Sequence, residues 1–302
     1  MRNGTMCAAT FAIACSTPLH GAELTMASRT RSQPVPGATI VGRAACKNST
    51  WLLADSSELI EVREGLNAVV HAVAGLSNSD RPWGLACLTD DTLWTMASSR
   101  DLVRLDRTGR VQERFTVPLP RIALFAAGDR LLFQPLPVAT GASALMTGPA
   151  RQPAASRPWP GLTSHGASTR EAQLAQNLVA CGIAYERQVP CWFINQTEFT
   201  VSDGASARTV KLPTITIPEV DRAMPVRDIA LAADKWFWYV LAGRDRVLGR
   251  PAGVRLVRAH EQLNGVSSIN LRPGARVILS ATDSRCRVLL ADGSIAEVAV
   301  TP

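Results

Sequence analysis

Short runs of apolar residues, divided by polar turns, recur along most of the chain. The stretch LWTMASSRDLVRLDRTGRVQERFTVPLP, residues 93–120, contains three such runs separated by two turns. Short runs that are bounded by Gly, Asp, Ser or Pro are typical of β-strands. Helical periodicity is nearly absent, and the one candidate, STREAQLAQNL at residues 168–178, is interpreted as part of a loop. The pattern therefore predicts an all-β protein.

A turn with glycine after a polar residue recurs between the apolar runs. Clear copies are LDRTGRV at 105–111, LLADGSI at 289–295, TVSDGAS at 200–206 and EVREGLN at 61–67. Glycine takes positive φ at no steric cost, which suits a tight turn between antiparallel strands. With the weaker copies ALMTGPA and GRPAGVR, the turn residues are Gly65, Gly109, Gly148, Gly204, Gly253 and Gly293. Their mean spacing of about 46 residues indicates six repeated units.

A second series, of tryptophan-bearing apolar runs, keeps step with the turns. Trp51, Trp94, Trp192 and Trp238 each lie in a run that precedes a turn. A large ring repeated at one place in the unit is expected to pack between neighbouring sheets. Another short apolar run comes before most of these, for example WGLACL from Trp83. Each unit therefore has room for four short strands.

Four antiparallel strands repeated six times predict a six-bladed β-propeller with four strands per blade, and a ring of seven blades is the alternative. Residues 36–302 then form a single domain. The expected blades are 36–79, 80–118, 119–165, 166–222, 223–263 and 264–302. Both terminal units contain enough apolar runs for four strands. Ring closure therefore does not require a strand shared between the two ends, and such a strand stays an alternative.

Residues 81–118, RPWGLACLTDDTLWTMASSRDLVRLDRTGRVQERFTVP, resemble one blade of a known group of six-bladed propellers. The group comprises the NHL-repeat proteins and the streptogramin-lyase-like and gluconolactonase-like proteins, whose units often read P-x-G-apolar-A, then D-x-x-L-W, then I-x-R-apolar-D-x-x-G-x-V. The match is good over this blade, partial at 58–76 and 285–300, and poor between 136 and 185. The resemblance implies the propeller fold, and because propellers host many unrelated activities it implies no single function.

Composition and charge narrow the class of partner. Of the 302 residues, 46% are hydrophobic and 19% are charged, as in globular proteins. The formal net charge is +7, and all but three of the 32 basic residues are arginine. The arginines are scattered, with no run of five or more basic residues, which argues against a polybasic tail for nucleic acid. We therefore expect no nucleic-acid partner.

Residues 1–22 have the features of a weak secretory signal, with one positive charge, an uncharged apolar stretch and small residues around Ala22. We expect cleavage near Ala22, a linker over residues 23–35, and a periplasmic or extracellular protein. The apolar stretch is too short to cross a bilayer, so no transmembrane span is expected. The alternatives are lipidation of Cys15, as in a lipoprotein, and a cytoplasmic protein whose translation starts at Met26.

Export would permit disulfide bonds among the cysteines that follow the signal. Cys181 and Cys191 are the preferred pair, because they end the stretch CGIAYERQVPC and lie on apolar runs expected to be adjacent antiparallel strands. Cys46 and Cys87 occupy similar places in successive units and could meet across them. The alternative, implied by a cytoplasmic start, is that these thiols are free in a reducing compartment.

The resemblance also implies where chemistry would lie. In the lactonase-like relatives a divalent cation, such as Ca²⁺ or Mg²⁺, is held in the central channel by carboxylates and amides of the innermost strands. Asn177, Asp228 and Asn270 are the candidate metal ligands here, although the ligand pattern of those relatives does not align with this chain. The lyase relatives use a histidine near the channel. His165 has no paired acid nearby, so we assign no catalytic residue and expect no cofactor, with a divalent cation as the alternative.

Residues 141–176 are rich in Pro, Ala, Ser and Gly, and we interpret them as an insertion. Long loops in compact folds are often functional or disordered. The candidate partner-binding residues in this insertion are Arg151, Arg157, Trp159 and His165. We interpret the chain as a monomeric, non-catalytic, exported propeller that binds a protein or a cell-envelope polymer. The alternative is a metal-dependent lactonase- or lyase-like enzyme that uses the central channel.

Overall fold

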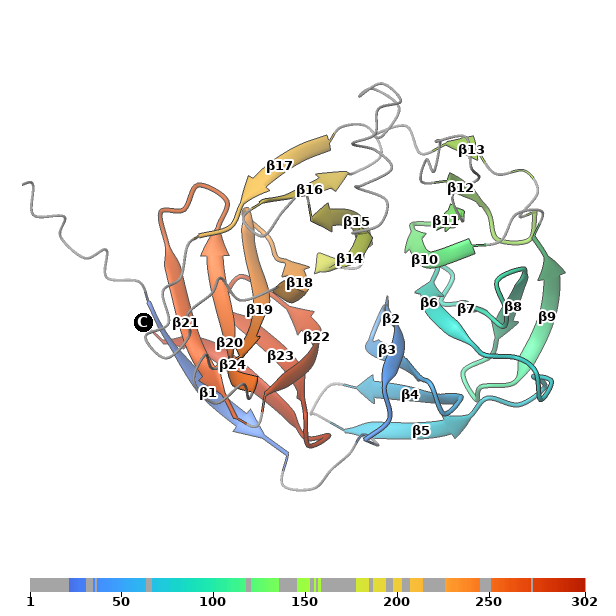
Figure 1. The fold of residues 1–302 in the computed structure, drawn as a ribbon, viewed down its shortest axis with the longest axis horizontal. Helices are drawn as coiled ribbons and strands as arrows, with labels where there is room; N and C mark the ends of the chain where they lie inside the picture. The colour runs from blue at the N-terminus through green and yellow to red at the C-terminus, as the bar shows by residue number, and fades with distance from the viewer. Residues whose placement is uncertain are drawn as a thin grey trace, which may run out of the picture.

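The chain folds into a ring of small β-sheets. In the computed structural model, the described residues are 22–30, 35, 37–63, 67–117, 121–135, 146–152, 155, 157–158, 178–184, 187–193, 198–202, 207–213, 226–244, 251–272 and 274–301. They form 24 strands in six four-stranded antiparallel sheets, which surround a central axis like wedges (Figure 1). None of these residues forms a helix with the length and apolar character needed to span a bilayer. The predicted all-β propeller with four strands per blade is confirmed.

In each blade the strands follow one another from the axis outwards (Figure 1). The innermost strands are β2 (Ile40–Cys46), β6 (Trp83–Cys87), β10 (Arg121–Ala127), β14 (Leu178–Ala184), β18 (Val226–Leu231) and β22 (Ala275–Ala281). The second strands are β3 (Ser49–Ala54), β7 (Leu93–Met96), β11 (Arg130–Pro135), β15 (Arg187–Phe193), β19 (Trp236–Arg244) and β23 (Arg285–Leu290). The third strands are β4 (Glu58–Arg63), β8 (Asp101–Leu105), β12 (Met146–Pro149), β16 (Glu198–Ser202), β20 (Pro251–His260) and β24 (Ile295–Thr301). The outermost strands are β5 (Ala68–Ala72), β9 (Val111–Thr116), β13 (Arg157–Pro158), β17 (Ala207–Lys211), β21 (Val266–Leu271) and β1 (Glu23–Arg29).

The N-terminal strand closes the ring. β1 pairs antiparallel with β24, so that Leu24 lies opposite Val300, and it becomes the fourth strand of the sixth blade. The predicted linker over residues 23–35 is therefore wrong for 23–29. The predicted start of the sixth blade at residue 264 is also wrong, because β21 completes the fifth blade. Pairing of the two chain ends within one sheet closes the ring with backbone hydrogen bonds. The apolar residues of β1 do not by themselves indicate that β24 is the strand with which β1 pairs.

The predicted turn glycines are not all equivalent. Gly109 and Gly293 do lie in turns with positive φ, of 83° and 81°. Gly109 connects a third strand to a fourth strand, whereas Gly293 connects a second strand to a third. Gly148 and Gly253 lie within β12 and β20, so their assignment to turns is wrong. Gly65 and Gly204 are outside the described residues.

The predicted insertion over residues 141–176 is only partly an insertion. Residues 146–149 and 157–158 form β12 and β13, the outer half of the third blade. Proline and alanine in this stretch obscured its strand pattern, because proline is tolerated on the edge of a sheet but is rare within strands. The rest of the predicted insertion falls mainly outside the described residues.

The core lies between neighbouring blades. Apolar side chains of each sheet pack against the next sheet, as between the first and second blades, where Trp51 and Leu85 belong to one buried cluster. Trp51, Trp94 and Trp238 are at most 1% exposed, so the predicted packing role of these tryptophans is confirmed. The side chain of Trp192 is outside the described part of the structure. These wedge-shaped interfaces hold the innermost strands at fixed places around the axis.

Candidate functional site

A buried ion pair joins innermost strands on the axis side of the ring. Arg43 of β2 and Asp228 of β18 approach to 2.6 Å between Nη1 and Oδ2, and their side chains are 8% and 7% exposed. These strands belong to the first and fifth blades. The pair therefore reaches across the sixth blade, whose innermost strand is β22.

The pair also satisfies backbone groups on the inner edge of the sixth blade. The N–H of Ile278 donates to Oδ2 of Asp228 at 2.6 Å, and Nη1 of Arg43 donates to the carbonyl oxygen of Ile278 at 2.5 Å. An innermost strand leaves such groups without a strand partner on the axis side. The hydroxyl of Thr50 similarly donates to the carbonyl oxygen of Leu279 at 2.9 Å. These contacts join three blades at their inner edges.

Both members of the pair follow an irregularity in their strand. The register of β18 with β19 shifts between Val226 and Asp228, and the register of β2 with β3 shifts between Ile40 and Gly42. A bulge of this kind breaks the strict alternation of side chains and redirects the residue that follows it. The direction of Asp228 and Arg43 therefore depends on the bulges as well as on position along the strand.

The carboxylate of Asp228 is fully engaged. Burial, the largest cause, raises its pKa above the ordinary value, while the charge of Arg43 and the N–H groups of Ile278 and Ile229 act in the opposite direction. Oδ1 accepts from Ile229 at 2.9 Å, and Oδ2 accepts from the other two groups. A buried carboxylate is tolerable when it is paired and hydrogen-bonded in this way. Asp228 therefore joins the first, fifth and sixth blades through its contacts.

The predicted metal ligands are not brought together. Asp228 lies on the innermost strand of the fifth blade, whereas Asn270 lies on its outermost strand, opposite Arg255. Three strand spacings, roughly 14 Å, separate these strands. The placement of Asn270 on an innermost strand is wrong, because the run SSINL is the last strand of its blade. Asn177 is outside the described residues.

The two histidines in the described part of the chain support packing at the periphery. The ring of His71, on β5, stacks on Trp51 with centroids 6.0 Å apart. His260, at the end of β20, meets the edge of Trp236 at 5.1 Å. Its Nδ1 accepts the N–H of Gln262, so its Nε2 donates to the carbonyl oxygen of Asp234. His165 is outside the described residues.

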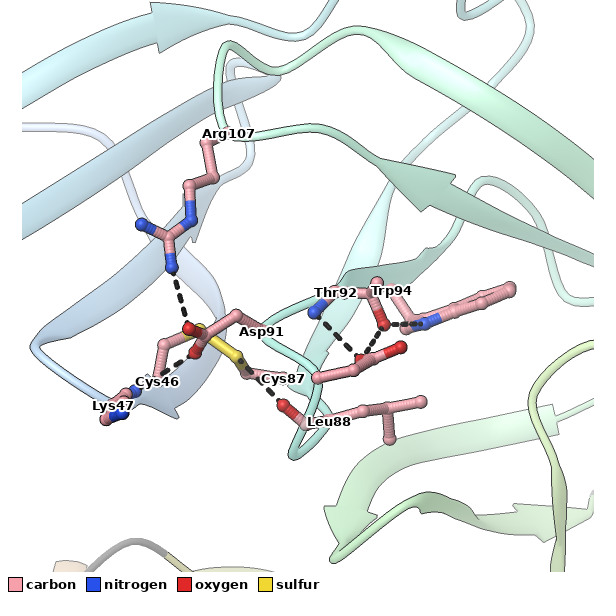
Figure 2. Close-up of a disulfide and its surroundings, with 9 residues drawn as sticks. Cys46, Lys47, Cys87, Leu88, Asp91, Thr92, Trp94 and Arg107 are labelled. Atoms are coloured by element: carbon pink, nitrogen blue, oxygen red, sulfur yellow. Dashed lines mark hydrogen bonds and ion pairs between the residues drawn. A yellow bond between two sulfur atoms is a disulfide. The ribbon is translucent and has the colours of Figure 1, made fainter.

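A disulfide joins the ends of the innermost strands in the first two blades. Cys46 and Cys87 are bonded, with Cα atoms 5.6 Å apart, which confirms that these residues meet across successive units. Asp91, in the turn after β6, points toward the sulfur atoms (Figure 2). Its carboxylate accepts the N–H of Lys47 at 3.3 Å and forms a 3.0 Å ion pair with Arg107. The result is a compact, partly exposed polar cluster.

The preferred cysteine pair stays a prediction. Cys181 and Cys191 lie on the adjacent antiparallel strands β14 and β15, as expected. The register places Cys191 opposite Val179 and Cys181 opposite Val189, two residues away along the ladder. Their side chains are outside the described part of the structure.

The predicted partner-binding residues are placed only in part. Arg151 lies just after β12, has a side chain 65% exposed and forms a 3.2 Å ion pair with Glu113 of the second blade. Arg157 lies on β13, the outermost strand of the third blade. Trp159 and His165 are outside the described residues. The two placed arginines thus mark the rim of the ring at the second and third blades.

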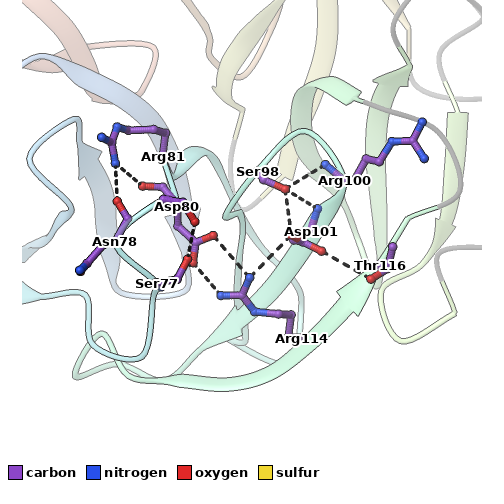
Figure 3. Close-up of polar contacts among 10 residues, drawn as sticks. Ser77, Asn78, Asp80, Arg81, Ser98, Arg100, Asp101, Arg114 and Thr116 are labelled. Atoms are coloured by element: carbon purple, nitrogen blue, oxygen red, sulfur yellow. Dashed lines mark hydrogen bonds and ion pairs between the residues drawn. The ribbon is translucent and has the colours of Figure 1, made fainter.

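A polar network fixes the segment between the first and second blades (Figure 3). Asp80 accepts Nη2 of Arg114 and the N–H of Ser77, both at 2.7 Å. The hydrogen bond from Arg114 is the largest cause that holds the pKa of Asp80 below its ordinary value. Arg81 turns back to the carbonyl oxygen of Asn78 at 3.0 Å. This network anchors the segment that leads into β6.

Sequence reasoning missed Arg43 and Asp91. Arg43 is the one charged residue in the apolar strand IVGRAAC, and an isolated charge in such a run signals a buried partner. Asp91 follows another aspartate in the turn TDDT, a composition common to many turns. The first signal could have been used, whereas the second is too general to single out the residue.

Comparison with known proteins identifies the fold. No protein-family model matches the sequence, and no curated protein is detectably similar to it. A solved structure of streptogramin B lyase aligns over 95% of this chain and 100% of its own, with 11% identity and a TM-score of 0.52. Virginiamycin B lyase from Staphylococcus aureus aligns over 92% and 99%, with 10% identity and a TM-score of 0.49. YCF48 bound to D1 peptide aligns over 93% and 96%, with 12% identity and a TM-score of 0.47. The resemblance to streptogramin-lyase-like propellers is thus confirmed at the level of the fold.

Proposed function

We propose that this propeller is an exported, non-catalytic scaffold that binds a protein or a cell-envelope polymer. The observation that carries the proposal is the engagement of Asp228. This innermost-strand carboxylate is matched by Arg43 and hydrogen-bonded to the backbone of two further strand residues. An acid or metal ligand at the axis would need a carboxylate oxygen that is available to a substrate or cation. Here the group serves the rigidity of the ring, which suits a binding platform.

Two features support export. The Cys46–Cys87 disulfide is of a kind that forms and persists mainly in oxidising compartments. Strand β1 begins at Glu23, directly after the expected cleavage site near Ala22, so cleavage there leaves the closing strand whole. A mass measurement of the N-terminus of the protein from the cell envelope tests this part. A chain that begins at Met1 or Met26 would contradict it.

The rim at the second and third blades is the proposed contact surface. Arg151 is largely exposed there, and Arg157 lies on the neighbouring outermost strand. The ion pair of Arg151 with Glu113 is solvent-exposed and contributes little to stability, so a change at Arg151 should test binding rather than folding. Arg285, on the sixth blade, is a matched control, because its side chain is 67% exposed and pairs with Glu297 at 3.3 Å.

The binding test compares three proteins with isolated cell envelope from the host. Wild type and Arg285→Glu should sediment with the envelope, and Arg151→Glu should do so several-fold less. Protease treatment of the envelope distinguishes a protein partner, whose loss abolishes binding, from a polymer. Equal binding of all three proteins, or none, would contradict the proposed surface. Turnover of a lactone, or of streptogramin B, that requires Ca²⁺ or Mg²⁺ would overturn the non-catalytic assignment.

A further inference from the structure

Three groups that ligate metals in proteins meet at the ends of β2 and β6. The Sγ atoms of Cys46 and Cys87 and a carboxylate oxygen of Asp91 all lie within 4.8 Å of one another. They come from two blades and from the turn after β6, and Asp91 points toward the disulfide (Figure 2). This convergence is independent of the ion pair near the axis and of the proposed contact surface on the rim.

The three groups are also positioned by contacts other than the sulfur–sulfur bond. Cys46 and Cys87 end neighbouring innermost strands, which are anchored by their own sheets. The carboxylate of Asp91 is oriented by the N–H of Lys47 at 3.3 Å and by the guanidinium of Arg107, whose side chain is 56% exposed. Unlike the buried Asp228, whose partner Arg43 is 8% exposed, Asp91 can therefore turn an oxygen toward a cation. Hydrogen bonds to a ligating carboxylate are the kind of support that metal sites use to fix their ligands.

The chemistry of the three groups suits a soft divalent cation. Zn²⁺ binds thiolate sulfur at about 2.3 Å and carboxylate oxygen at about 2.0–2.2 Å in a tetrahedral arrangement. Tetrahedral geometry places two such sulfurs about 3.8 Å apart, which two cysteines at the observed 5.6 Å Cα separation can reach by side-chain rotation. Two thiolates and one carboxylate carry three negative charges. The cation neutralises two of these, and Arg107 faces the third.

We propose that the Cys46–Cys87 disulfide is the oxidised form of a Zn²⁺ site whose third ligand is Asp91. The metal site forms only under reducing conditions, and the disulfide is the state expected after export. Two molecules of a small thiol reduce the disulfide: the protein sulfur–sulfur bond breaks, two protein thiols form, and the reductant becomes its own disulfide. Zn²⁺ then binds the two sulfurs as thiolates and displaces their two protons to water. A water molecule completes the fourth position. Cys46 and Asp91 are half-buried rather than enclosed, so reductant and metal can reach the cluster.

The experiment measures Zn²⁺ binding in both redox states. The purified chain is reduced anaerobically with dithiothreitol, freed of reductant by gel filtration, and titrated with Zn²⁺ against a chromogenic chelator. Reduced wild type should bind one Zn²⁺ per chain, and oxidised wild type should bind none. Asp91→Asn, reduced in the same way, should bind at least about tenfold more weakly. Co²⁺ in place of Zn²⁺ should give the charge-transfer absorption of a cobalt–thiolate bond.

The control is the double variant Cys46→Ser/Cys87→Ser, which keeps the other cysteines of the chain. If reduced wild type binds Zn²⁺ no more tightly than this variant, the site does not exist. If Asp91→Asn binds as tightly as wild type, the assignment of the third ligand is wrong. Should the double variant fail to fold, oxidised wild type is the folded reference, since it has the same sequence and lacks only the two thiols. A Zn²⁺-dependent rise in the melting temperature of reduced wild type alone would support the site independently.

Discussion

At the scale of single residues, Gly42 allows the innermost strands of the first two blades to approach closely. A Cβ atom at this position would lie 2.7 Å from the backbone carbon of Gly84 and 2.8 Å from the backbone nitrogen of Leu85. Backbone atoms cannot rotate away, so Gly42→Ala should force the blades apart and lower the free energy of unfolding by about 1–3 kcal/mol. Gly37→Ala is the control, because nothing lies within 4 Å of its Cβ position. Equal urea midpoints for the two variants would contradict the close approach.

Asp80 should make stability depend on pH. The hydrogen bond from Arg114 lowers the pKa of Asp80 in the folded protein, so its stabilising contribution is present at neutral pH and is lost as pH falls through that lowered value. Asp80 is buried, whereas Arg114 is 37% exposed and partly screened by water. We expect Asp80→Asn to cost about 1–2 kcal/mol at pH 7. Urea unfolding from pH 7 to pH 3 should show this difference shrinking below about pH 4. A difference that stays constant would show that the carboxylate charge is not its source.

At the scale of elements, the pair of Arg43 and Asp228 couples blades that do not share a sheet. Arg43→Met should leave a buried carboxylate without its charge partner and cost about 3–5 kcal/mol. Asp228→Leu should leave Arg43 and the N–H of Ile278 without their shared acceptor. The double variant should lose much less than the sum of the two single losses, because no unpaired charge remains. A double-mutant cycle by chemical denaturation measures this coupling, and additive losses would show that the two residues act independently.

The element scale also shows where sequence reasoning stopped. The apolar runs around Trp83 and Trp94 predicted strands that the structure contains, because alternation and bounding turns are local signals. Strand order was harder to predict. The run at 267–271 looks like any other short strand, and only pairing with β20 shows that it ends the fifth blade. The same limit applied to Asp228, since a bulge between residues 226 and 228 sets its direction and has no distinct sequence signature.

At the scale of the whole molecule, repetition made the architecture predictable and the site difficult to predict. A spacing of about 46 residues implies a ring of similar sheets, whichever turn carries the glycine. The equivalent places of Cys46 and Cys87 in adjacent units indicated that they could meet, and they do, although Cys181 and Cys191 were the preferred pair. The contacts of Asp91 and Arg107 depend instead on how two turns from different parts of one blade approach, which no repeat encodes. The repeat therefore predicts which residues occupy equivalent positions in neighbouring blades. It does not predict contacts that occur in one blade alone, such as that of Asp91 with Arg107.

Ring closure gives the whole molecule a sharp dependence on its first strand. Leu24 is 6% exposed and packs in the cluster that contains Val298, between the fifth and sixth blades. Glu23, Leu24 and Thr25 pair with Thr301, Val300 and Ala299. A chain that starts at Met26 loses these pairs and that buried side chain, so it should be less stable than a chain that starts at Glu23 by about 2 kcal/mol or more. Urea midpoints of the two chains measure the difference in stability, and Leu24→Ala in the longer chain measures how much of it comes from the Leu24 side chain.

Because the unpaired end of β24 would stay open in the shorter chain, that chain should also associate at high concentration, which light scattering detects. Equal midpoints would show that β1 contributes little to closure, and would remove the structural objection to a start at Met26.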